Sequence, residues 1–187
     1  TIVHFSTDYV FSGHGGKSTI VENLPQYGYR EEDVPDPISK YGESKALGEQ
    51  RLLSVFCHPE RSDPSPREGR GEGSRDREIL RSAQNDNVGI WYIIRTSKLF
   101  GPPGTGATSK KSFPEMMLGL ARTKGRIEAI DAEAGSPTYV NDLVEAVCRV
   151  IDGDVSSGIY HITNNGACTW YEYAKAAVEY AGVKAEV

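Results

Sequence analysis

Two short apolar runs, each ending in polar residues, limit what this chain can fold into more than any other feature. The first is TIVHF at 1–5, followed by STD at 6–8, and the second lies at 90–95 and ends in RTSK at 95–98. Short runs rich in β-branched and aromatic residues are typical of strands buried on both faces, as in a parallel sheet. Ligands of such sheets bind beyond the carboxyl ends of the strands, so the two polar stretches are the first candidates for a site.

Helical patterns separate and follow these runs. One spans about 38–56, with Ser39 at a position suited to an N-cap, and the last begins at Thr169 and ends near Gly182. Between them the patterns predict two helices and two short strands, the helices at 112–123 and 140–152 and the strands at 127–130 and 158–162. The alternation of strands and helices indicates an α/β fold with a largely parallel sheet.

Residues 57–87 differ in composition from the rest of the chain. They hold six of the twelve arginines, none of the nine lysines and no aromatic residue, and proline, glycine and serine are frequent. A stretch with so little apolar surface cannot offset the conformational entropy that is lost on ordering. The sequence therefore predicts a disordered insertion within one α/β domain formed by 1–56 and 88–187.

The composition argues against several classes of function. The net charge is −5, with 26 acidic and 21 basic residues, which disfavours a nucleic-acid-binding protein. The four histidines and three cysteines show no ligand spacing, so no metal site is predicted, and the thiols are expected to be reduced, as in the cytoplasm. No apolar run reaches 18 residues, so no membrane span is predicted. The chain opens within a strand pattern and without Met, so we expect it to be part of a longer protein.

The segment YGESK at 41–45 places a phenol and an ammonium four residues apart on the helix predicted at 38–56. Side chains at this spacing are neighbours on a helix surface. A free phenol has a pKa of about 10, which is too high for efficient proton transfer at neutral pH, and an adjacent ammonium lowers it. Together with the hydroxyl of Thr7 at the end of the first strand, Tyr41 and Lys45 form a candidate proton-relay site that interconverts an alcohol and a carbonyl.

Three motifs together resemble the extended short-chain dehydrogenase/reductase family: STDYVF at 6–11, YGESKALGE at 41–49 and RTSKLFG at 95–101. Within that family the likeness is greatest to the dTDP-4-dehydrorhamnose reductases and their sugar-nucleotide-binding relatives. Two C-terminal stretches extend it, GSPTYVNDLVEAV and GIYHITNNGACTWYEYA, so that it covers nearly all of the chain outside the segment of unusual composition. The resemblance implies the C-terminal part of a Rossmann-like, doubly wound parallel sheet, followed by a small substrate-binding region.

The resemblance also implies an activity, namely NAD(P)-dependent reduction of the 4-keto group of a nucleotide-activated sugar, with NADPH or NADH as the hydride donor. Tyr41 is expected to protonate the keto oxygen, assisted by Lys45 and Thr7 as the other catalytic residues. The expected cofactor-binding residues are Tyr41, Lys45, Arg95 and Thr96. The expected substrate-binding residues are Thr7, Asp8, Ser97 and Lys98. The partner is then the nucleotide sugar, with no nucleic-acid or membrane partner and with a homodimer left open.

The chain departs from the family pattern at two places. Such reductases usually carry Trp where this chain has Lys98, which leaves the sugar open, and no glycine-rich dinucleotide loop of the GxxGxxG type is present. A sugar-nucleotide epimerase or dehydratase of the same family shares the Thr, Tyr and Lys, and a non-catalytic sugar-nucleotide-binding, regulatory or truncated product is a further alternative. Single residues also have plainer interpretations: Thr7 as a turn cap, Arg95 as an ion-pair partner, and His4 and His161 as hydrogen-bonded core histidines.

Overall fold

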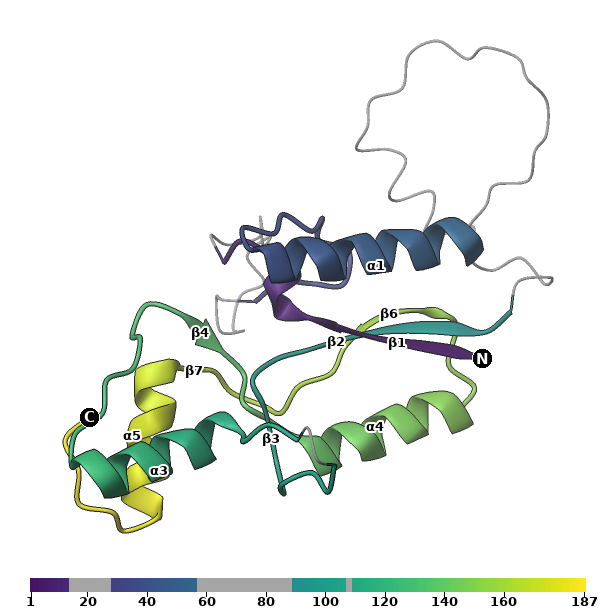
Figure 1. Ribbon diagram of the computed structural model, residues 1–187. Coiled ribbons are helices and arrows are strands. Elements are labelled where there is room, and N and C mark those ends of the chain that lie inside the picture. Colours follow the sequence, from purple (N-terminus) through teal and green to yellow (C-terminus); the bar gives the residue numbers. More distant parts are fainter. Residues whose placement is uncertain (14–27, 57–88, 107–108) are drawn as a thin grey trace, which may run out of the picture. The chain divides into compact units, whose positions relative to one another are not determined.

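The computed structural model describes residues 1–13, 28–56, 89–106 and 109–187 (Figure 1). These residues form two compact units. The first unit draws on Thr1–Arg95 and Val150–His161, and the second on Thr96–Arg149 and Ile162–Val187. The insertion predicted at 57–87 lies outside the described residues, so its disorder stays a prediction.

The first unit is built on a three-stranded sheet with the strand order β1–β2–β6. The strands span Ile2–Thr7 (β1), Trp91–Thr96 (β2) and Gly158–His161 (β6). β2 and β6 are parallel, with Arg95 opposite His161. All six residues of β2 are buried, as expected of the central strand of a covered sheet. The predicted α/β fold with a parallel sheet is confirmed.

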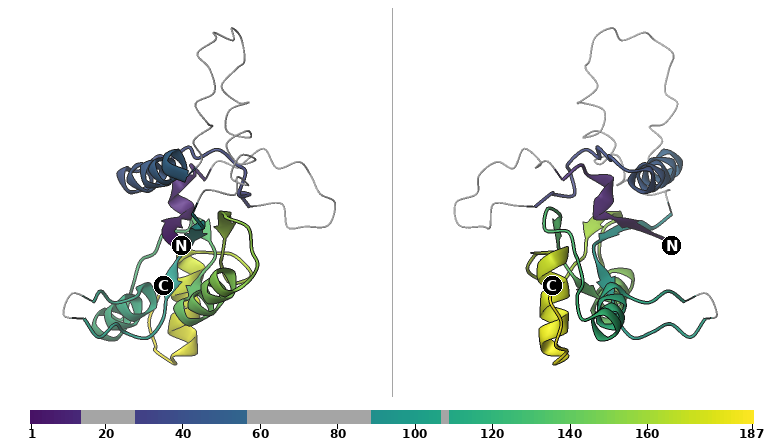
Figure 2. Two further views of the ribbon diagram at one scale, coloured as in Figure 1. Left: turned by 90° about the vertical axis from the view of Figure 1, so that its right-hand side faces the viewer. Right: turned by 60° about the vertical axis from the view of Figure 1, so that its left-hand side comes forward.

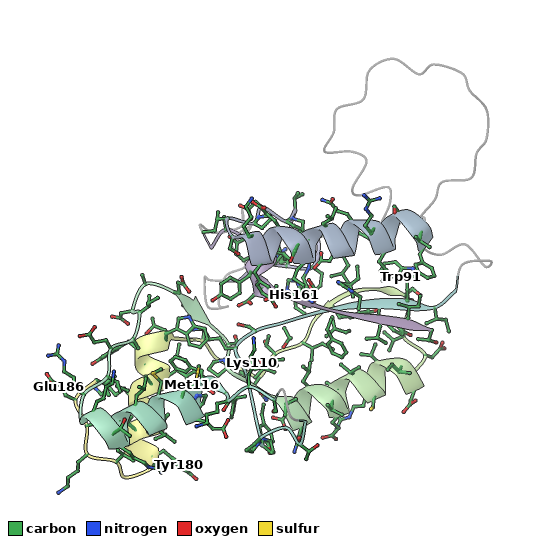
Figure 3. The ribbon with its side chains drawn as sticks, viewed as in Figure 1. Trp91, Lys110, Met116, His161, Tyr180 and Glu186 are labelled. Atoms are coloured by element: carbon green, nitrogen blue, oxygen red, sulfur yellow. The ribbon has the colours of Figure 1, made fainter. Side chains whose placement is uncertain are left out.

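Helix α1 (Lys40–Phe56) covers one face of this sheet (Figures 1 and 2). Ser39 caps its first turn, because the Ser39 hydroxyl accepts a hydrogen bond from the Gly42 N–H at 3.0 Å, and the predicted N-cap is thereby confirmed. Toward the other end of the helix, Trp91 of β2, labelled in Figure 3, packs against three of its side chains, Leu52, Leu53 and Phe56.

The buried stripe of α1 consists of small residues and one acid. Gly42, Ala46 and Glu49 are its buried residues, and their spacing of four and three places them on one face of the helix. The small side chains admit the short 3₁₀ helix η1 (Asp8–Val10), which follows β1, so that the buried Val10 packs with Ala46.

A buried ion pair joins α1 to β2. The Arg95 guanidinium donates from Nη2 to Glu49 Oε2 at 2.7 Å and from Nε to Glu49 Oε1 at 3.0 Å. The two side chains are only 3% and 2% exposed, so neither charge is solvated by water. Taking two charges out of water costs several kcal/mol per ion, which a bidentate pair offsets only while both partners are present.

The second unit packs helix α3 (Phe113–Lys124) against helix α5 (Trp170–Tyr180) (Figure 1). α5 begins with a reciprocal cap, in which the Glu172 N–H donates to Thr169 Oγ1 and the Thr169 N–H donates to the Glu172 carboxylate. One buried cluster of the unit includes Ala121, Ile127, Ala174 and Val178. Two pairs of two-residue strands complete the unit, β3 (Leu99–Phe100) with β5 (Thr138–Tyr139), and β4 (Ala134–Gly135) with β7 (Cys168–Thr169).

Most of the predicted elements of this part of the chain are confirmed, but one strand is wrong. The helices match to within one or two residues, including α4 (Val140–Asp152). The strand predicted at 127–130 does not form. Ile127 donates its N–H to Glu186 O at 2.8 Å, and the adjoining Arg126 makes an isolated bridge to Glu186. The Ile127 side chain fills the core of the unit, so its apolar pattern reflects burial rather than strand pairing.

The described part of the chain shows neither a membrane-spanning helix nor a cluster of metal ligands. None of its helices is both long enough and apolar enough to cross a lipid bilayer. No group of three or more His, Cys, Asp or Glu side chains within it is arranged to hold a metal ion.

Replacing Glu49 by Ala tests the role of the buried ion pair. The substitution leaves the Arg95 charge buried and unpaired, so we expect the free energy of unfolding to fall by about 3–5 kcal/mol. The exposed pair of Arg149 and Glu145 on α4 supplies the control, and Glu145→Ala is expected to change stability by no more than about 0.5 kcal/mol. Urea denaturation of both variants checks this, and equal losses would contradict a special role for the buried pair.

Candidate active site

The predicted catalytic pair lies on the first turns of α1. Lys45 donates a hydrogen bond from Nζ to the Phe5 carbonyl oxygen of β1 at 2.7 Å. An ammonium has three N–H donors, and this bond uses one of them while it fixes the direction of the side chain. Tyr41 lies one turn earlier and is 55% exposed, with its ring edge-on to the ring of Tyr9 at 6.0 Å between centroids. The helix therefore presents an accessible phenol and an anchored ammonium on consecutive turns.

Thr7 and Asp8 lie where β1 passes into η1. The Thr7 hydroxyl donates to Asp8 Oδ1 at 3.0 Å and accepts from the Tyr9 N–H at 3.3 Å, which makes Thr7 the N-cap of η1. The plainer interpretation of Thr7 as a turn cap is confirmed. A hydroxyl has a single donor, so Thr7 can donate to a ligand only after its O–H turns away from Asp8.

Two buried hydroxyls at the carboxyl ends of the strands have no hydrogen-bond partner within the described ranges. They are Ser6 Oγ on β1 and Thr96 Oγ1 on β2, and both residues are more than nine-tenths buried. A buried polar group without a partner costs about 1–3 kcal/mol. Each of these hydroxyls is therefore a candidate partner for a polar ligand group.

His4 is a neutral neighbour of Lys45. Burial lowers the pKa of its imidazole below the usual 6.5, the positive charge of Lys45 lowers it further, and Glu49 raises it. His4 Nε2 is buried and has no hydrogen-bond partner among the described residues, so the prediction of a hydrogen-bonded core histidine is wrong here. Because the ring stays neutral at neutral pH, Lys45 does not face a second positive charge from this side.

The contacts of Arg95 are those of an ion-pair partner. Besides its pair with Glu49, Arg95 Nη1 contacts the Glu31 carbonyl oxygen and His161 Nε2, each at 3.3 Å. The guanidinium also lies 5.0 Å from the centroid of the Phe11 ring. All of these contacts are internal to the protein, so the cofactor-binding role of Arg95 stays a prediction that its contacts do not support.

His161 completes this network from the end of β6, where Figure 3 labels it. Its Nδ1 contacts the Tyr29 carbonyl oxygen at 3.1 Å, and its Nε2 contacts Arg95 Nη1. A carbonyl can only accept and a guanidinium can only donate, so the partners assign the proton to Nδ1 and leave Nε2 as an acceptor. Here the predicted hydrogen-bonded core histidine is confirmed.

Ser97 and Lys98, predicted to bind substrate, belong to the second unit. Lys98 has a φ of +43°, in the left-handed region that a residue with a side chain adopts only under strain. Its Nζ donates to Cys168 O at 2.8 Å and to Glu133 O at 3.2 Å and lies 4.3 Å from the centroid of the Trp170 ring. The ammonium is thus engaged by the β4–β7 strand pair and by the start of α5.

Three residues of this region were not assigned a role from the sequence. Tyr9 contacts the ring of Tyr41, and Gly42 and Glu49 supply the buried face of α1. Tyr9 and Gly42 adjoin predicted residues within STDYVF and YGESK, and Glu49 stands four residues after Lys45. This spacing predicts that Glu49 shares a helix face with Lys45, and it is the sequence feature that could have drawn attention to Glu49.

A comparison with known proteins places the chain in a family. The sequence model of the family described as RmlD substrate binding domain matches residues 1–59 and 56–187, which is the whole chain. The chain belongs to this family. The RmlD match includes the candidate site, since Thr7, Tyr41 and Lys45 all fall within its first segment.

The chain spans about half of the length of the similar proteins that it matches. The chain is 35% identical over 185 residues to the spore coat polysaccharide biosynthesis protein SpsK of Bacillus subtilis, covering 99% of the chain and 48% of that protein. It is 31% identical over 181 residues to dTDP-4-dehydrorhamnose reductase of Mycobacterium tuberculosis, covering 97% of the chain and 45% of that protein. The crystal structure of dTDP-4-dehydrorhamnose reductase from Bacillus anthracis, in complex with NADP, superposes with a TM-score of 0.65 at 30% identity, covering 99% of the chain and 49% of that structure.

The environment of His161 predicts how the stability of this RmlD-family chain depends on pH. Burial lowers the pKa of His161 from 6.5; Arg95 also lowers it, while Glu31, the Tyr29 carbonyl and Glu49 raise it. Above pH 6.5 the His161 imidazole is neutral in both the folded and the unfolded chain, so its contribution to the free energy of unfolding is complete. Below this pH the unfolded imidazole binds a proton before the folded one does, so the free energy of unfolding falls until the pH reaches the folded pKa.

His161→Asn isolates this effect because the amide keeps one donor and one acceptor but does not titrate. We expect the loss of unfolding free energy between pH 7.5 and pH 5.5 to be smaller in the variant than in the wild type. Urea denaturation at several pH values measures it. An identical pH dependence in the two proteins, or a wild type that gains stability toward acid pH, would count against the assignment.

Proposed function

We propose that this chain carries the proton-donating and sugar-binding residues of an NAD(P)-dependent reductase that acts on a nucleotide-activated 4-keto sugar. The observation that carries the proposal is the anchoring of the Lys45 ammonium on the Phe5 carbonyl oxygen, one helical turn from the exposed phenol of Tyr41. Phe5 lies two residues before Thr7, so the same strand end supplies the hydroxyl. The dTDP-4-dehydrorhamnose reductases among the relatives support this choice of reaction and substrate class.

In the proposed reaction the keto oxygen gains a proton while its carbon gains a hydride, which the reduced nicotinamide supplies when bound. Tyr41 donates the proton from Oη, and the Lys45 ammonium stabilises the phenolate that remains. The Thr7 hydroxyl donates a hydrogen bond to the same oxygen, which requires it to leave Asp8 Oδ1. We propose that Asp8 Oδ1 accepts from a sugar hydroxyl in place of Thr7, which links substrate binding to the release of Thr7.

The strand ends carry the kinds of hydrogen-bond donor that a nicotinamide nucleotide needs. The Ser6 and Thr96 hydroxyls are buried without partners inside the described segments, and the Lys45 ammonium has donors beyond the one bonded to Phe5 O. Ribose oxygens and the carboxamide oxygen accept hydrogen bonds from hydroxyl and ammonium donors of this kind. We propose that Lys45, Thr96 and Tyr41 hold the cofactor and that Ser6 adds a contact that sequence analysis did not assign.

The sugar-binding role of Ser97 and Lys98 is also proposed. Because Lys98 Nζ is engaged by Cys168 O, Glu133 O and the Trp170 ring, we propose that its aliphatic stem, rather than its charge, faces the substrate.

Tyr41→Phe tests the proposal most simply, because it removes one hydroxyl and keeps the ring that packs against Tyr9. We expect an unchanged melting temperature and a fall in kcat/KM of roughly 10²–10⁴-fold, which is the usual contribution of a positioned general acid. Since the chain covers 49% of the Bacillus anthracis reductase, turnover is measured on a fusion behind the remaining part of that enzyme, with NADPH and dTDP-4-dehydrorhamnose. A folded fusion that binds NADPH but whose Phe variant turns over as fast as the wild type would refute the proposal.

The same assay separates the roles of Lys45 and Thr7. Lys45→Met should lower kcat and also weaken NADPH binding, because the ammonium serves both the phenol and the cofactor. Thr7→Val should lower kcat more than Thr7→Ser, because Ser keeps the hydroxyl that is proposed to donate to the keto oxygen. Equal effects of Val and Ser at position 7 would limit Thr7 to a packing role.

A further inference from the structure

Helix α1 approaches η1 so closely at one position that only glycine fits. A Cβ placed on Gly42 would stand 2.1 Å from the Tyr9 carbonyl oxygen and 3.0 Å from Pro37 Cβ. Non-bonded carbon atoms prefer separations of about 3.5–4.0 Å, so an alanine at this position displaces either the helix or the backbone of η1. The obstructing atom belongs to the backbone and cannot rotate aside as the end of a side chain can.

Gly42 lies between the two functional side chains of α1, directly after Tyr41 and three residues before Lys45. The residue whose carbonyl faces Gly42 is Tyr9, and the ring of Tyr9 contacts the ring of Tyr41. The Lys45 ammonium reaches back to Phe5 O on the strand that leads into η1. A shift of the helix at Gly42 therefore alters the placement of both side chains relative to the end of β1.

We propose that Gly42 is a positioning residue for the proton-relay site. The missing side chain lets α1 rest on the Tyr9 carbonyl, and this contact sets Tyr41 and Lys45 against the strand end that bears Thr7. The effect on turnover rests on the proposed function, whereas the seating of the helix is a property of the chain without any ligand. The two are therefore tested by different measurements.

Gly48 makes a second and weaker contact of the same kind. A Cβ placed on it would stand 3.1 Å from Cε1 and 3.2 Å from Nε2 of His4 on β1. These separations are tight, but the obstructing atoms belong to a side-chain ring that can yield by a few tenths of an ångström. We therefore expect Gly48→Ala to displace α1 less than Gly42→Ala does.

The experiment compares Gly42→Ala and Gly48→Ala with Gly119→Ala. Gly119 is an exposed glycine within α3, and a Cβ placed on it meets nothing within 4 Å, so it controls for the higher helix propensity of alanine. The first measurement is the nuclear Overhauser effect between the rings of Tyr9 and Tyr41 in the tyrosine-labelled chain without ligand. The second is the separate kcat and KM of each variant in the fusion protein, alongside its melting temperature.

For Gly42→Ala we expect loss of the Overhauser effect and a fall in kcat of about 10²-fold, the scale of a 1 Å misplacement, with KM for the sugar little changed. Gly48→Ala should show a smaller fall in kcat, and Gly119→Ala should keep both signals with an equal or higher melting temperature. If Gly42 served stability alone, the substitution would lower the melting temperature but leave the kcat of the folded protein unchanged. That result would overturn the proposal.

Other outcomes also decide the question. A Gly42→Ala variant that keeps the ring contact, or that loses it while kcat equals that of the wild type, overturns the proposal. If Gly42→Ala does not fold, Gly48→Ala decides, since loss of the ring contact there with an unchanged kcat would refute positioning of the site by α1. If the wild-type fusion shows no turnover, the proposed function fails, and the Overhauser measurement alone supports or overturns the seating of α1 on Tyr9.

Discussion

The buried pair of Arg95 and Glu49 is the interaction on which the rest of the first unit depends. It joins the middle of α1 to the central strand of the sheet, and through His161 and the Glu31 carbonyl it reaches β6 and the segment before α1. A charge pair this deeply buried tolerates few alternative placements, because any shift that breaks one bond leaves a charge without water. The position of α1 along the sheet is thereby fixed, and with it the face that carries Tyr41 and Lys45.

Much of the fold and the core of the candidate site follow from the sequence because local patterns determine them. The strands at the start of the chain and before Arg95 are apolar runs, and α1 begins at a capping Ser39. Tyr41 and Lys45 are predictable because a spacing of four residues fixes their relation on a helix whatever the helix packs against. The end of the strand near Thr7 is also predictable, because the polar residues at 6–8 directly follow the apolar run at 1–5.

What the sequence does not reveal depends on contacts between distant segments. The 26 acidic residues offer many partners for Arg95, and only the folded chain selects Glu49. The apolar run at Ile127 resembles a strand but serves a helix-packed core, and the two-residue strands are too short to show any periodicity. The unpaired Nε2 of His4 and the left-handed backbone of Lys98 are likewise set by packing, and no local pattern signals either of them.

The central claim is that Tyr41 and Thr7 converge on one oxygen of a keto sugar. The most direct test is a crystal structure of the fusion protein with NADPH and a nucleotide sugar bound in place of the substrate. The account predicts that Tyr41 Oη and Thr7 Oγ1 both lie within about 2.6–3.2 Å of the oxygen on C4 of the sugar, with Thr7 released from Asp8. A sugar bound away from these hydroxyls, or a Thr7 hydroxyl that still donates to Asp8 Oδ1 in the complex, would contradict it.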